Sequence, residues 1–337
     1  MGEKVTMRDI AKEMNVSAVT VSKAMANKDG VGRELREAII KKAAEMGYVY
    51  PSSASQNDNG DKTGNIGILI ADHFLSDDAF YTKLYKHVLV SAGERGYSTI
   101  LEVVTPECEQ NRILPQVIRN HKVDGIIFLG QIDRDYIVTV AAEGLPFVFL
   151  DFYDETYQDD AVVTDNLYGA YQLTDYLIKR GHKRIGFIGS INATSSILDR
   201  YLGMYKALIK NGLDIRRDWI IEDRNDTGRY IDVELPSDMP DAFVCNNDEI
   251  ACTVVGKLKA NGYRVPEDVS IVGFDDHVCA VQCEPKLTTY HVDVKSLGEA
   301  AASAMIRKIR TGARARGMTV VSGSMIERDS VARLNKK

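Results

Sequence analysis

A regular alternation of apolar and amphipathic segments, starting at Asn65, is the feature that most restricts the fold of this chain. Runs such as NIGILIAD (65–72) are short and rich in Ile and Val, which is typical of strands buried in a parallel sheet. Amphipathic segments between the runs predict helices that cover the sheet. The further strands are expected at STILEVV (98–104), VDGIIFLG (123–130), PFVFLDF (146–152), RIGFIGS (184–190), DAFVCNND (241–248) and VSIVGFDD (269–276).

The order of these runs predicts an α/β body of two lobes, each with a parallel, doubly wound sheet. Four runs belong to the first lobe and three to the second. In such sheets ligands bind beyond the carboxyl ends of the strands. An Asp there often caps the next helix, and we expect this role for Asp248 and Asp276. The polar residues at strand ends are Asp72, Asp151, Asn247, Asp248, Asp275 and Asp276.

The first fifty residues have a different pattern, which predicts three short helices. Thr6 can cap the first helix, with Asp9 as its capping-box partner. Asn15 can adopt the left-handed conformation that ends this helix, and Ser17 can cap the second. A third helix is expected from about Arg33 to Met46. The residues expected in the shared small core are Met7, Ile10, Ala11, Met14, Val16, Val21, Ala24, Met25, Leu35, Ile39, Ile40 and Ala43.

A unit of three helices of this kind presents the start of its second helix to a DNA major groove. Hydroxyl groups there suit phosphate oxygens, Ala18 and Val19 suit a thymine methyl group, and Lys23 suits a guanine edge. The alternative is a helical hairpin that packs on a neighbouring domain. The candidate DNA-binding residues are Thr6, Ser17, Ala18, Val19, Thr20, Ser22 and Lys23.

Charge and composition restrict the partners. The net charge is −6, but residues 1–50 hold nine Lys and Arg against seven Asp and Glu, so the basic excess lies where DNA would bind. No apolar run approaches the roughly 18 residues of a membrane span. The first twenty residues lack the apolar core and cleavage site of a signal peptide, which predicts a cytoplasmic protein.

Nothing in the sequence predicts a cofactor or a metal. The five cysteines are odd in number and scattered, which indicates reduced thiols. Cys279 and Cys283 are the closest pair, but no second ligand pair follows at zinc spacing, so packed thiols are expected. The six histidines show neither metal spacing nor catalytic-triad spacing.

The segment from Thr6 to Asn27, followed by REAIIKKAAEMGY (36–48), resembles the DNA-binding headpiece of the lactose-repressor (LacI) family almost position by position. The resemblance implies a sequence-specific transcriptional regulator, most simply a repressor, that binds a near-palindromic operator as a homodimer. It also implies that Ala18, Val19 and Lys23 read the bases.

The remaining chain resembles the sensor domain of the same family, which is similar to periplasmic sugar-binding proteins. The most specific strings are GHKRIGFIG (181–189), DRYLGMYKAL (199–208), RVPEDVSIVGFDD (264–276) and PKLTTY (285–290). The resemblance implies that a small sugar-like effector binds between the lobes, and carboxylates with a planar guanidinium suit such a polyol. The effector-binding residues that it implies are Asp72, Phe80, Tyr81, Asp151, Ser196, Arg200, Asn247 and Asp275.

The resemblance also implies domain boundaries. The headpiece is expected at 1–50, a linker at 51–64 and the effector-binding domain at 65–332. Within that domain we expect lobe 1 at about 65–163 and 294–322, and lobe 2 at about 164–292 and 323–332. Dimer contacts are expected from outward residues of the first lobe, with Tyr85, Val88 and Leu89 as candidates, although these residues can equally face their own sheet.

Two segments depart from the family. Relatives carry a hinge helix after the headpiece, with a Leu that wedges into the minor groove at the operator centre. Here the sequence from Tyr48 to Gly64 is polar and acidic, and the wedge position falls near Asp58, which phosphate would repel. We therefore expect a flexible linker and no strong central kink. Between Asp226 and Ala242, two prolines indicate that a helix of the second lobe is missing.

Two other classes of protein remain open. Clustered Asp residues at strand ends also suit an enzyme, but the sequence has no nucleophile elbow, phosphate-binding loop or acid/base pair. A plain sugar-binding module would lack the headpiece. Within the regulator class, a protein corepressor is the alternative to a sugar. The residues do not indicate the effector's identity, its sign of action or the operator sequence.

Overall fold

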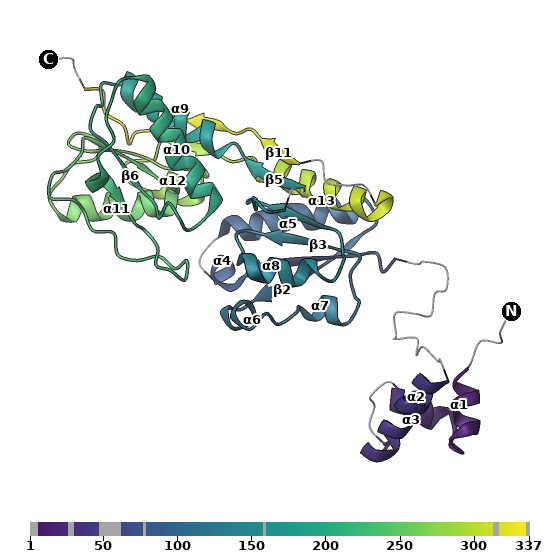
Figure 1. Cartoon of the computed structure of the whole chain (residues 1–337). Coiled ribbons are helices and arrows are strands. Elements are labelled where there is room, and N and C mark those ends of the chain that lie inside the picture. The colour runs from purple at the N-terminus through teal and green to yellow at the C-terminus, as the bar shows by residue number, and fades with distance from the viewer. Residues whose placement is uncertain are drawn as a thin grey trace. The chain divides into compact units, whose positions relative to one another are not determined.

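The computed structural model describes residues 6–25, 30–46, 62–76, 79–157, 160–312 and 317–334 (Figure 1). The chain separates into two compact units, Met1–Lys62 and Thr63–Lys337. We describe each unit by itself. The predicted wedge position at Asp58 and most of the predicted linker lie outside the described residues.

The first unit is a headpiece of three helices, α1 (Met7–Glu13), α2 (Ala18–Met25) and α3 (Arg33–Glu45). Its core is Ile10, Ala11, Val21, Ala24, Ile39 and Ala43, with Met7, Met14, Val16, Val31 and Met46 packed around it. The expectation for two residues of α3 is wrong, because Leu35 is 39% and Ile40 is 47% exposed. Ile39 and Ala43 lie one turn apart on the buried side of α3. Ile40 lies off that side, and Leu35 lies on it but in the first turn of the helix, before the core begins.

The second unit contains two α/β lobes, which confirms the predicted fold class. Lobe 1 is built on a six-stranded parallel sheet in the order β11-β5-β4-β3-β1-β2. Its strands are β1 (Asn65–Ala71), β2 (Ser98–Val104), β3 (Gly125–Leu129), β4 (Phe147–Leu150), β5 (Ala161–Thr164) and β11 (Met318–Val321).

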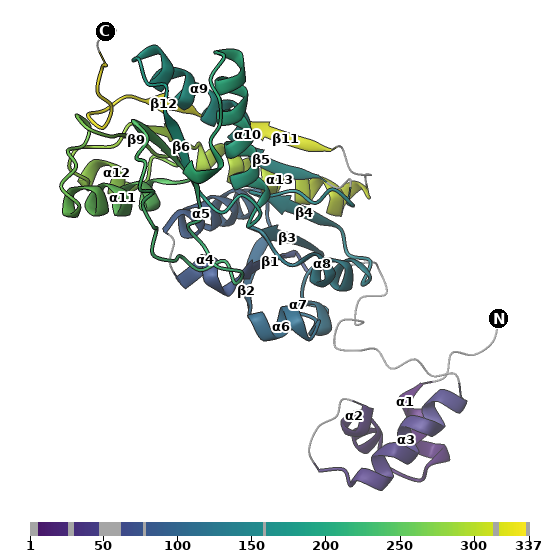
Figure 2. The ribbon, with the colours of Figure 1, turned by 60° about the vertical axis from the view of Figure 1, so that its left-hand side comes forward.

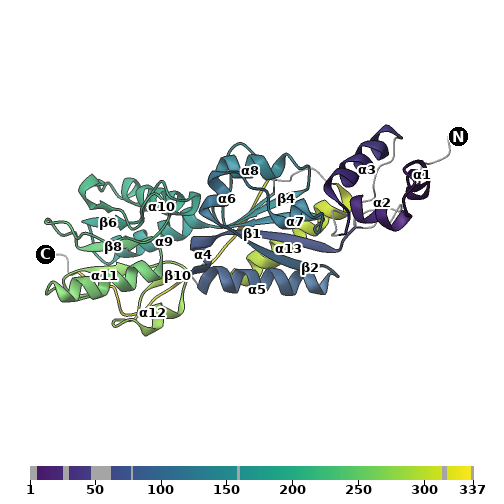
Figure 3. The same ribbon diagram turned by 90° about the horizontal axis from the view of Figure 1, so that it is seen from below.

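The helices of lobe 1 are α4 (Asp72–Ser76), α5 (Ala79–Glu94), α6 (Pro106–Gln110), α7 (Gln116–Arg119), α8 (Arg134–Ala141) and α13 (Val294–Thr311). Helices α5 and α13 pack together on one face of the sheet, and α8 lies on the other (Figure 3). Val88 of α5 is fully buried in this core, so its expected place at a dimer surface is wrong. Leu89, its neighbour, is 44% exposed.

Lobe 2 is built on a four-stranded parallel sheet in the order β7-β6-β8-β9. Helices α9 and α10 cover one face, and α11 and α12 cover the other (Figure 3). The elements are α9 (Asn166–Lys179), β6 (Ile185–Ile188), α10 (Ser195–Lys210), a 3₁₀ turn (Arg217–Trp219), β7 (Ile220–Ile221), β8 (Ala242–Cys245), α11 (Asp248–Ala260), β9 (Ser270–Val272) and α12 (Val278–Gln282).

The chain passes between the lobes three times. It leaves lobe 1 after β5, returns from β10 (Thr289–His291) to α13, and leaves again from β11 to β12 (Ser324–Ile326). Strands β10 and β12 pair antiparallel in a two-stranded sheet of their own. Strand β11 pairs with β5 and lies beside it in Figure 2, so two of the crossings start from neighbouring strands. Three neighbouring crossings are the usual construction of a hinge that lets two lobes close on a ligand.

Residues 222–241 contain no helix, which confirms the expectation for this segment. Arg224 and Tyr230 form an isolated antiparallel bridge, with a turn between them. The side chain of Asn225 holds the turn, because its Oδ1 accepts from the amides of Thr227 and Arg229, at 3.1 Å each. We call residues 224–230 the bridge loop.

Candidate effector site and DNA interface

The helix-turn-helix of the headpiece has the predicted local geometry. The carboxylate of Asp9 accepts from the amide of Thr6 at 2.7 Å, which makes the capping box. Asn15 has φ 51°, the left-handed conformation that ends α1. The hydroxyl of Ser17 accepts from the amide of Thr20 at 3.0 Å and so caps α2. Together these contacts fix the turn between α1 and α2, and with it the direction in which α2 begins.

The candidate DNA-binding residues lie on the accessible surface of this unit. Val19 is 65% exposed, so its methyl groups are accessible to a partner. Ala18 and Lys23 are also exposed, and Thr20 and Ser22 are half-buried. The amide and the hydroxyl of Thr6 both donate to the carboxylate of Asp9. The hydroxyl of Ser17 accepts from the Thr20 amide, and its own proton can be donated to a phosphate oxygen.

An inner chamber lies between the lobes of the second unit and contains seven of the eight predicted effector residues. Its volume is about 40 Å³. The lining residues are Phe74, Phe80, Tyr81, Asp151, Thr194, Ser196, Ile197, Arg200, Arg224, Asn246, Asn247 and Asp275. Asp72, the eighth predicted residue, begins α4 and is not among them. Because Phe74 follows two residues later in the same short helix, this helix turns Phe74 toward the chamber in place of Asp72.

Arg200 is the central cation of the inner chamber. It lies in α10 and is 5% exposed, so it is not the surface ion pair that was its alternative. Its Nε donates to Asn166 at 2.8 Å, one Nη donates to the carbonyl of Asn246 at 2.6 Å, and the other donates to Asp275 at 3.2 Å. The guanidinium also lies 3.8 Å from the ring centre of Phe274. These contacts fix the plane of the guanidinium before any ligand arrives.

The position of Arg200 depends on the close approach of two helices. At Gly203, one turn further along α10, a Cβ atom would lie 2.1 Å from the carbonyl oxygen of Leu167 in α9. Only glycine lets α10 lie this close to α9. The "DRYLG" part of the motif therefore supplies both the cation and the packing that places it.

Asp275 faces Arg200 from the turn after β9. Its φ of 98° is outside the regions that a non-glycine residue normally adopts, and such strain is concentrated at functional sites. Burial raises the pKa of its carboxyl, and the charge of Arg200 opposes the rise. Asp151 of lobe 1 has φ 69°, and its carboxylate accepts from the hydroxyl of Tyr81 at 2.9 Å. Carboxylates from both lobes thus reach one chamber.

The predicted caps have other roles. Asn247, and not Asp248, caps α11 by accepting from the amide of Ile250 at 2.9 Å. Asp248 is buried and accepts from the amide of His277 at 2.7 Å and the hydroxyl of Thr289 at 2.6 Å. Asp276 binds Arg328 and His291. Neither Asp248 nor Asp276 lines the inner chamber.

The sequence reasoning missed Phe74, Thr194, Ile197, Arg224 and Asn246. Arg224 is held by the hydroxyl of Tyr230 at 3.2 Å and by Asp223, whose Oδ2 is 3.5 Å from the Arg224 Nε. The hydroxyl of Tyr230 also accepts from Asn247 Nδ2 at 2.8 Å. Tyr230 therefore connects the bridge loop to a predicted effector residue, a connection that no local pattern signals.

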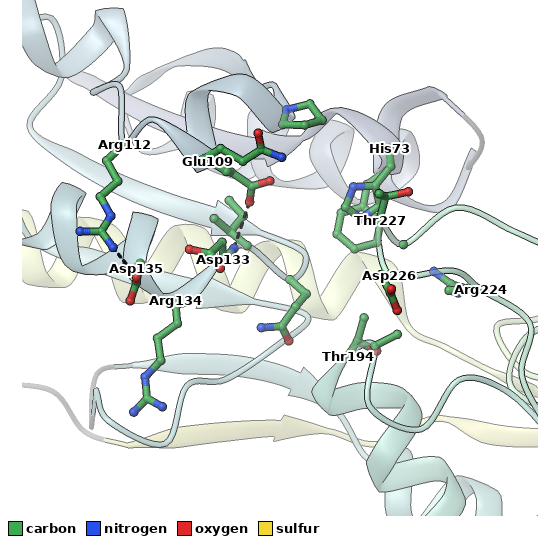
Figure 4. A pocket seen from close by; sticks show the side chains of 17 residues that line it. His73, Glu109, Arg112, Asp133, Arg134, Asp135, Thr194, Arg224, Asp226 and Thr227 are labelled. Atoms are coloured by element: carbon green, nitrogen blue, oxygen red, sulfur yellow. Dashed lines mark hydrogen bonds and ion pairs between the residues drawn. The ribbon is translucent and has the colours of Figure 1, made fainter.

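A larger outer chamber of about 600 Å³ adjoins the inner one (Figure 4). Phe74, Thr194 and Arg224 line both chambers. In Figure 4, Glu109 and Asp133 of lobe 1 lie on one side of this chamber and Asp226 of the bridge loop lies on the other, where Thr227 is beside His73 of lobe 1. At Gly228 a Cβ atom would lie 3.1 Å from Nε2 of His73, so the loop touches α4 of the other lobe.

The described residues include no group of three or more His, Cys, Asp or Glu side chains that could hold a metal ion. Among these residues there is also no helix long and apolar enough to cross a membrane.

Two family models match the chain. The model for bacterial regulatory proteins of the lacI family matches residues 6–51, and the model for a periplasmic binding protein-like domain matches residues 174–331. The first match includes all of α1, α2 and α3, and the second includes most of lobe 2.

Curated relatives match along almost the whole chain. The HTH-type transcriptional repressor PurR of Pasteurella multocida is 27% identical over 332 residues, which are 97% of this chain and 98% of that protein. The HTH-type transcriptional regulator DegA of Bacillus subtilis is 26% identical over 343 residues, which are 98% of this chain and 99% of that protein.

Solved structures share the fold. A complex of the transcriptional regulator CelR with cellobiose has a TM-score of 0.70 at 24% identity and covers 97% of this chain and 99% of that one. The lac repressor dimer bound to operator and the anti-inducer ONPF has a TM-score of 0.67 at 21% identity, over 98% and 100% of the two chains. This chain therefore contains a headpiece that matches the lacI family of bacterial regulatory proteins and a sensor domain that matches the periplasmic binding protein-like domain.

Proposed function

We propose that this chain is a transcriptional repressor whose affinity for a near-palindromic operator is controlled by a sugar-like effector bound between its lobes. The observation that carries the proposal is the inner chamber, where Arg200, Asp275 and Asn247 of lobe 2 face Asp151 and Tyr81 of lobe 1. A guanidinium fixed by three hydrogen bonds offers paired donors to adjacent hydroxyl oxygens, and the carboxylates accept from the hydroxyls. Phe74 and Phe80 supply apolar surface for a sugar ring.

The effector is proposed to be longer than one sugar ring. The inner chamber, at about 40 Å³, has room for little more than a water molecule. The adjoining outer chamber, at about 600 Å³, falls in the range of ordinary small-molecule sites. Because the two chambers share Phe74, Thr194 and Arg224, one ligand can place a polar end against Arg200 and its remainder under the bridge loop. A disaccharide or an aryl or alkyl glycoside has this shape.

The effector is proposed to act through the hinge. A ligand that contacts both lobes stabilises one angle between them, and a coupling of about 1–3 kcal/mol between sites is typical of such regulators. The chain is further proposed to act as a cytoplasmic homodimer, with one headpiece per operator half-site. Leu89 and Val90 on α5, which are 44% and 46% exposed, are the apolar residues we assign to the dimer surface.

In the headpiece, Ala18, Val19 and Lys23 are proposed to meet base edges, because they are exposed at or near the start of α2. Thr6, Ser17, Thr20 and Ser22 are proposed to contact phosphates. The chain is proposed to have no catalytic activity: the clustered carboxylates of the inner chamber have hydrogen-bond partners that suit binding, as Tyr81 does for Asp151.

A thermal-shift panel of mono- and disaccharides on the full-length chain tests the proposal. We expect at least one disaccharide or glycoside to raise the melting temperature, and the same compound to change the affinity for an operator-like duplex. Loss of the shift in Arg200→Lys, with its retention in the surface control Arg216→Lys, would locate the site. If no saccharide shifts the protein and a partner protein changes its DNA affinity instead, the corepressor alternative is correct.

A further inference from the structure

Three thiols meet on lobe 2, outside both chambers. Cys252 lies in α11, Cys279 lies in α12 and Cys283 follows the end of α12. The thiol of Cys252 donates to the carbonyl oxygen of Cys279 at 3.4 Å. The same carbonyl oxygen accepts from the amide of Cys283 at 2.8 Å, so the three residues meet at one carbonyl group. All three cysteines are free and half-buried, so small solutes reach them.

The other two cysteines differ from this cluster in ways that make them controls. Cys245 is in the middle of the lobe 2 core and 1% exposed, and burial raises its pKa well above the usual value. Cys108 lies in α6 of lobe 1 and is partly buried, as the cluster thiols are. Exposure alone therefore does not distinguish the cluster from Cys108. What distinguishes it is that Cys252 and Cys283 both bind the carbonyl oxygen of Cys279 and so lie next to each other.

The cluster is chemically asymmetric. The neighbouring Cys252 thiol is the main cause that lowers the pKa of Cys283 to about 7, and the nearby Lys259 ammonium assists. The Cys252 thiol also lowers the pKa of Cys279, whereas the pKa of Cys252 is raised. The thiolate is the nucleophilic form of cysteine. Cys283 is consequently the thiol prepared to react, and Cys252 is the protonated thiol beside it.

We propose that Cys252 and Cys283, with Cys279 beside them, form a peroxide-sensitive switch that closes a disulfide between α11 and the end of α12. The Cys283 thiolate attacks one oxygen of hydrogen peroxide, the O–O bond breaks, and hydroxide leaves and takes up a proton to become water. The resulting sulfenic acid is attacked at sulfur by the thiol of Cys252, and its oxygen leaves as a second water. Two thiols thus lose two electrons to one peroxide, and a reducing thiol reverses the reaction.

The disulfide would act on the region of the effector site. Helix α11 starts immediately after Asn247, and α12 starts three residues after Asp275. Two hydrogen bonds connect the start of α11 to the segment before α12: the amide of His277 donates to Asp248 at 2.7 Å, and the amide of Asp248 donates to the carbonyl oxygen of Phe274 at 2.9 Å. The ring of His277 also lies 3.8 Å from the carboxylate of Glu249. A disulfide holds its sulfur atoms about 2.05 Å apart, closer than any hydrogen bond between thiols. Oxidation therefore changes how α11 and α12 pack, and with them Asn247 and Asp275.

The first test is chemical and uses the full-length reduced protein with hydrogen peroxide. We expect the number of titratable thiols in the denatured protein to fall by two, and mass spectrometry to find Cys252 joined to Cys283. Cleavage at Glu249 in addition to Lys and Arg separates the peptide of Cys252 from that of Cys245. In Cys252→Ser a dimedone adduct should accumulate on Cys283, whereas Cys108→Ser should form the disulfide as the unchanged chain does.

Cys279 and Cys283 share one tryptic peptide, so the variants Cys279→Ser and Cys283→Ser identify the partner. The disulfide should persist in Cys279→Ser and disappear in Cys283→Ser. Loss of the disulfide in Cys279→Ser alone, or a bond that joins two chains on a non-reducing gel, would overturn the assignment.

The second test asks whether the disulfide regulates. The probe is a duplex selected from a random pool by the reduced protein. We expect peroxide to change its affinity at least fivefold, the low end of ordinary allosteric coupling, with recovery after dithiothreitol and no change in Cys252→Ser. A disulfide that leaves the duplex affinity unchanged refutes the switch. A saccharide panel without any hit refutes the proposed effector and leaves this result standing.

Discussion

At the scale of single residues, Arg200 explains most about the effector site. Removal of a guanidinium from water is costly, and the chain compensates with hydrogen bonds to Asn166, Asn246 and Asp275 and with the ring of Phe274. Residues that only stabilise a fold are rarely buried cations, because apolar residues serve that purpose at lower cost. A buried Arg whose guanidinium is fixed by three hydrogen bonds beside an open chamber is better explained as a group that binds a ligand.

Substitution of Arg200 by Lys should separate binding from folding. Lys keeps the charge but cannot donate a planar pair of hydrogen bonds, and hydrogen bonds to charged groups contribute about 1.5–3 kcal/mol. We expect effector affinity, measured by calorimetry, to fall at least tenfold while the unliganded protein still binds its operator. Arg216→Lys, on the surface of the same lobe, should leave the affinity unchanged. Equal losses in both variants would mean that the effect is not specific to the chamber.

Asp248 predicts a pH dependence of stability. Burial raises the pKa of its carboxyl well above the usual 3.8, so the folded state favours the protonated form. The stability contributed by that proton is complete below about pH 4 and is lost as the pH rises through the raised pKa. Asp248→Asn cannot ionise, and we expect its melting temperature to fall less between pH 5 and pH 8 than that of the unchanged chain. Parallel melting curves across this range would contradict the assignment.

The motif positions carried over from the family predicted seven residues of the inner chamber, because strand ends and helix starts meet there in any sheet of this type. Arg224 and Asn246 were not predicted. Arg224 comes from the bridge loop, which contains none of the motifs quoted in the sequence analysis. Asn246 acts through its backbone carbonyl, and a sequence gives no sign of which carbonyl will face a guanidinium.

At the scale of elements, the turn between α1 and α2 sets the orientation of α2, the helix that we propose to face DNA. Asn15 adopts φ 51°, which costs most residues about 1–2 kcal/mol and glycine nothing. We expect Asn15→Ala to destabilise the headpiece by about that amount and to weaken DNA binding, and Asn15→Gly to remain close to the unchanged chain. Circular dichroism melting of the full-length variants, with duplex titration, measures both effects. If Asn15→Ala and Asn15→Gly have the same melting temperature and the same DNA affinity, the left-handed conformation at this position does not contribute to either.

The linker carries a separate prediction, since Asp58 stands near the position where relatives place a wedge. A carboxylate is repelled by phosphate and does not insert between base steps. We expect little bending at the centre of a bound operator, as measured by energy transfer between dyes at the duplex ends, and we expect Asp58→Leu to increase both the bend and the affinity. A strong central kink with the unchanged chain would show that another residue does the work of the wedge.

Element prediction succeeded where patterns were long. The seven predicted strands are present as β1, β2, β3, β4, β6, β8 and β9. The strands β5, β7, β10, β11 and β12 were missed. The equally short β4, β6, β8 and β9 were found because they lie inside the recognised segments of seven or eight residues. In α3, Leu35 and Ile40 were wrongly placed inside, because Ile40 lies off the buried side and Leu35 lies in the first turn, before the core of Ile39 and Ala43 begins.

At the scale of the whole sensor unit, the bridge loop and the three crossings give the lobes two connections of different kinds. The crossings are covalent and lie together, as a hinge requires. The bridge loop reaches across to α4 only by contact, at Gly228 and His73. A ligand in the chambers lies between these two connections, so it can favour the closed arrangement of the lobes over the open one and thereby couple to the DNA-binding state.

The central claim is that effector and operator are coupled through one protein, and coupling is reciprocal. The most direct measurement is calorimetric titration of a disaccharide found in the saccharide panel into the full-length chain, first alone and then saturated with its operator duplex. The account predicts that the duplex changes the disaccharide's Kd by the same factor, about 5–150-fold, by which the disaccharide changes the duplex Kd. Equal disaccharide affinity with and without the duplex would contradict it.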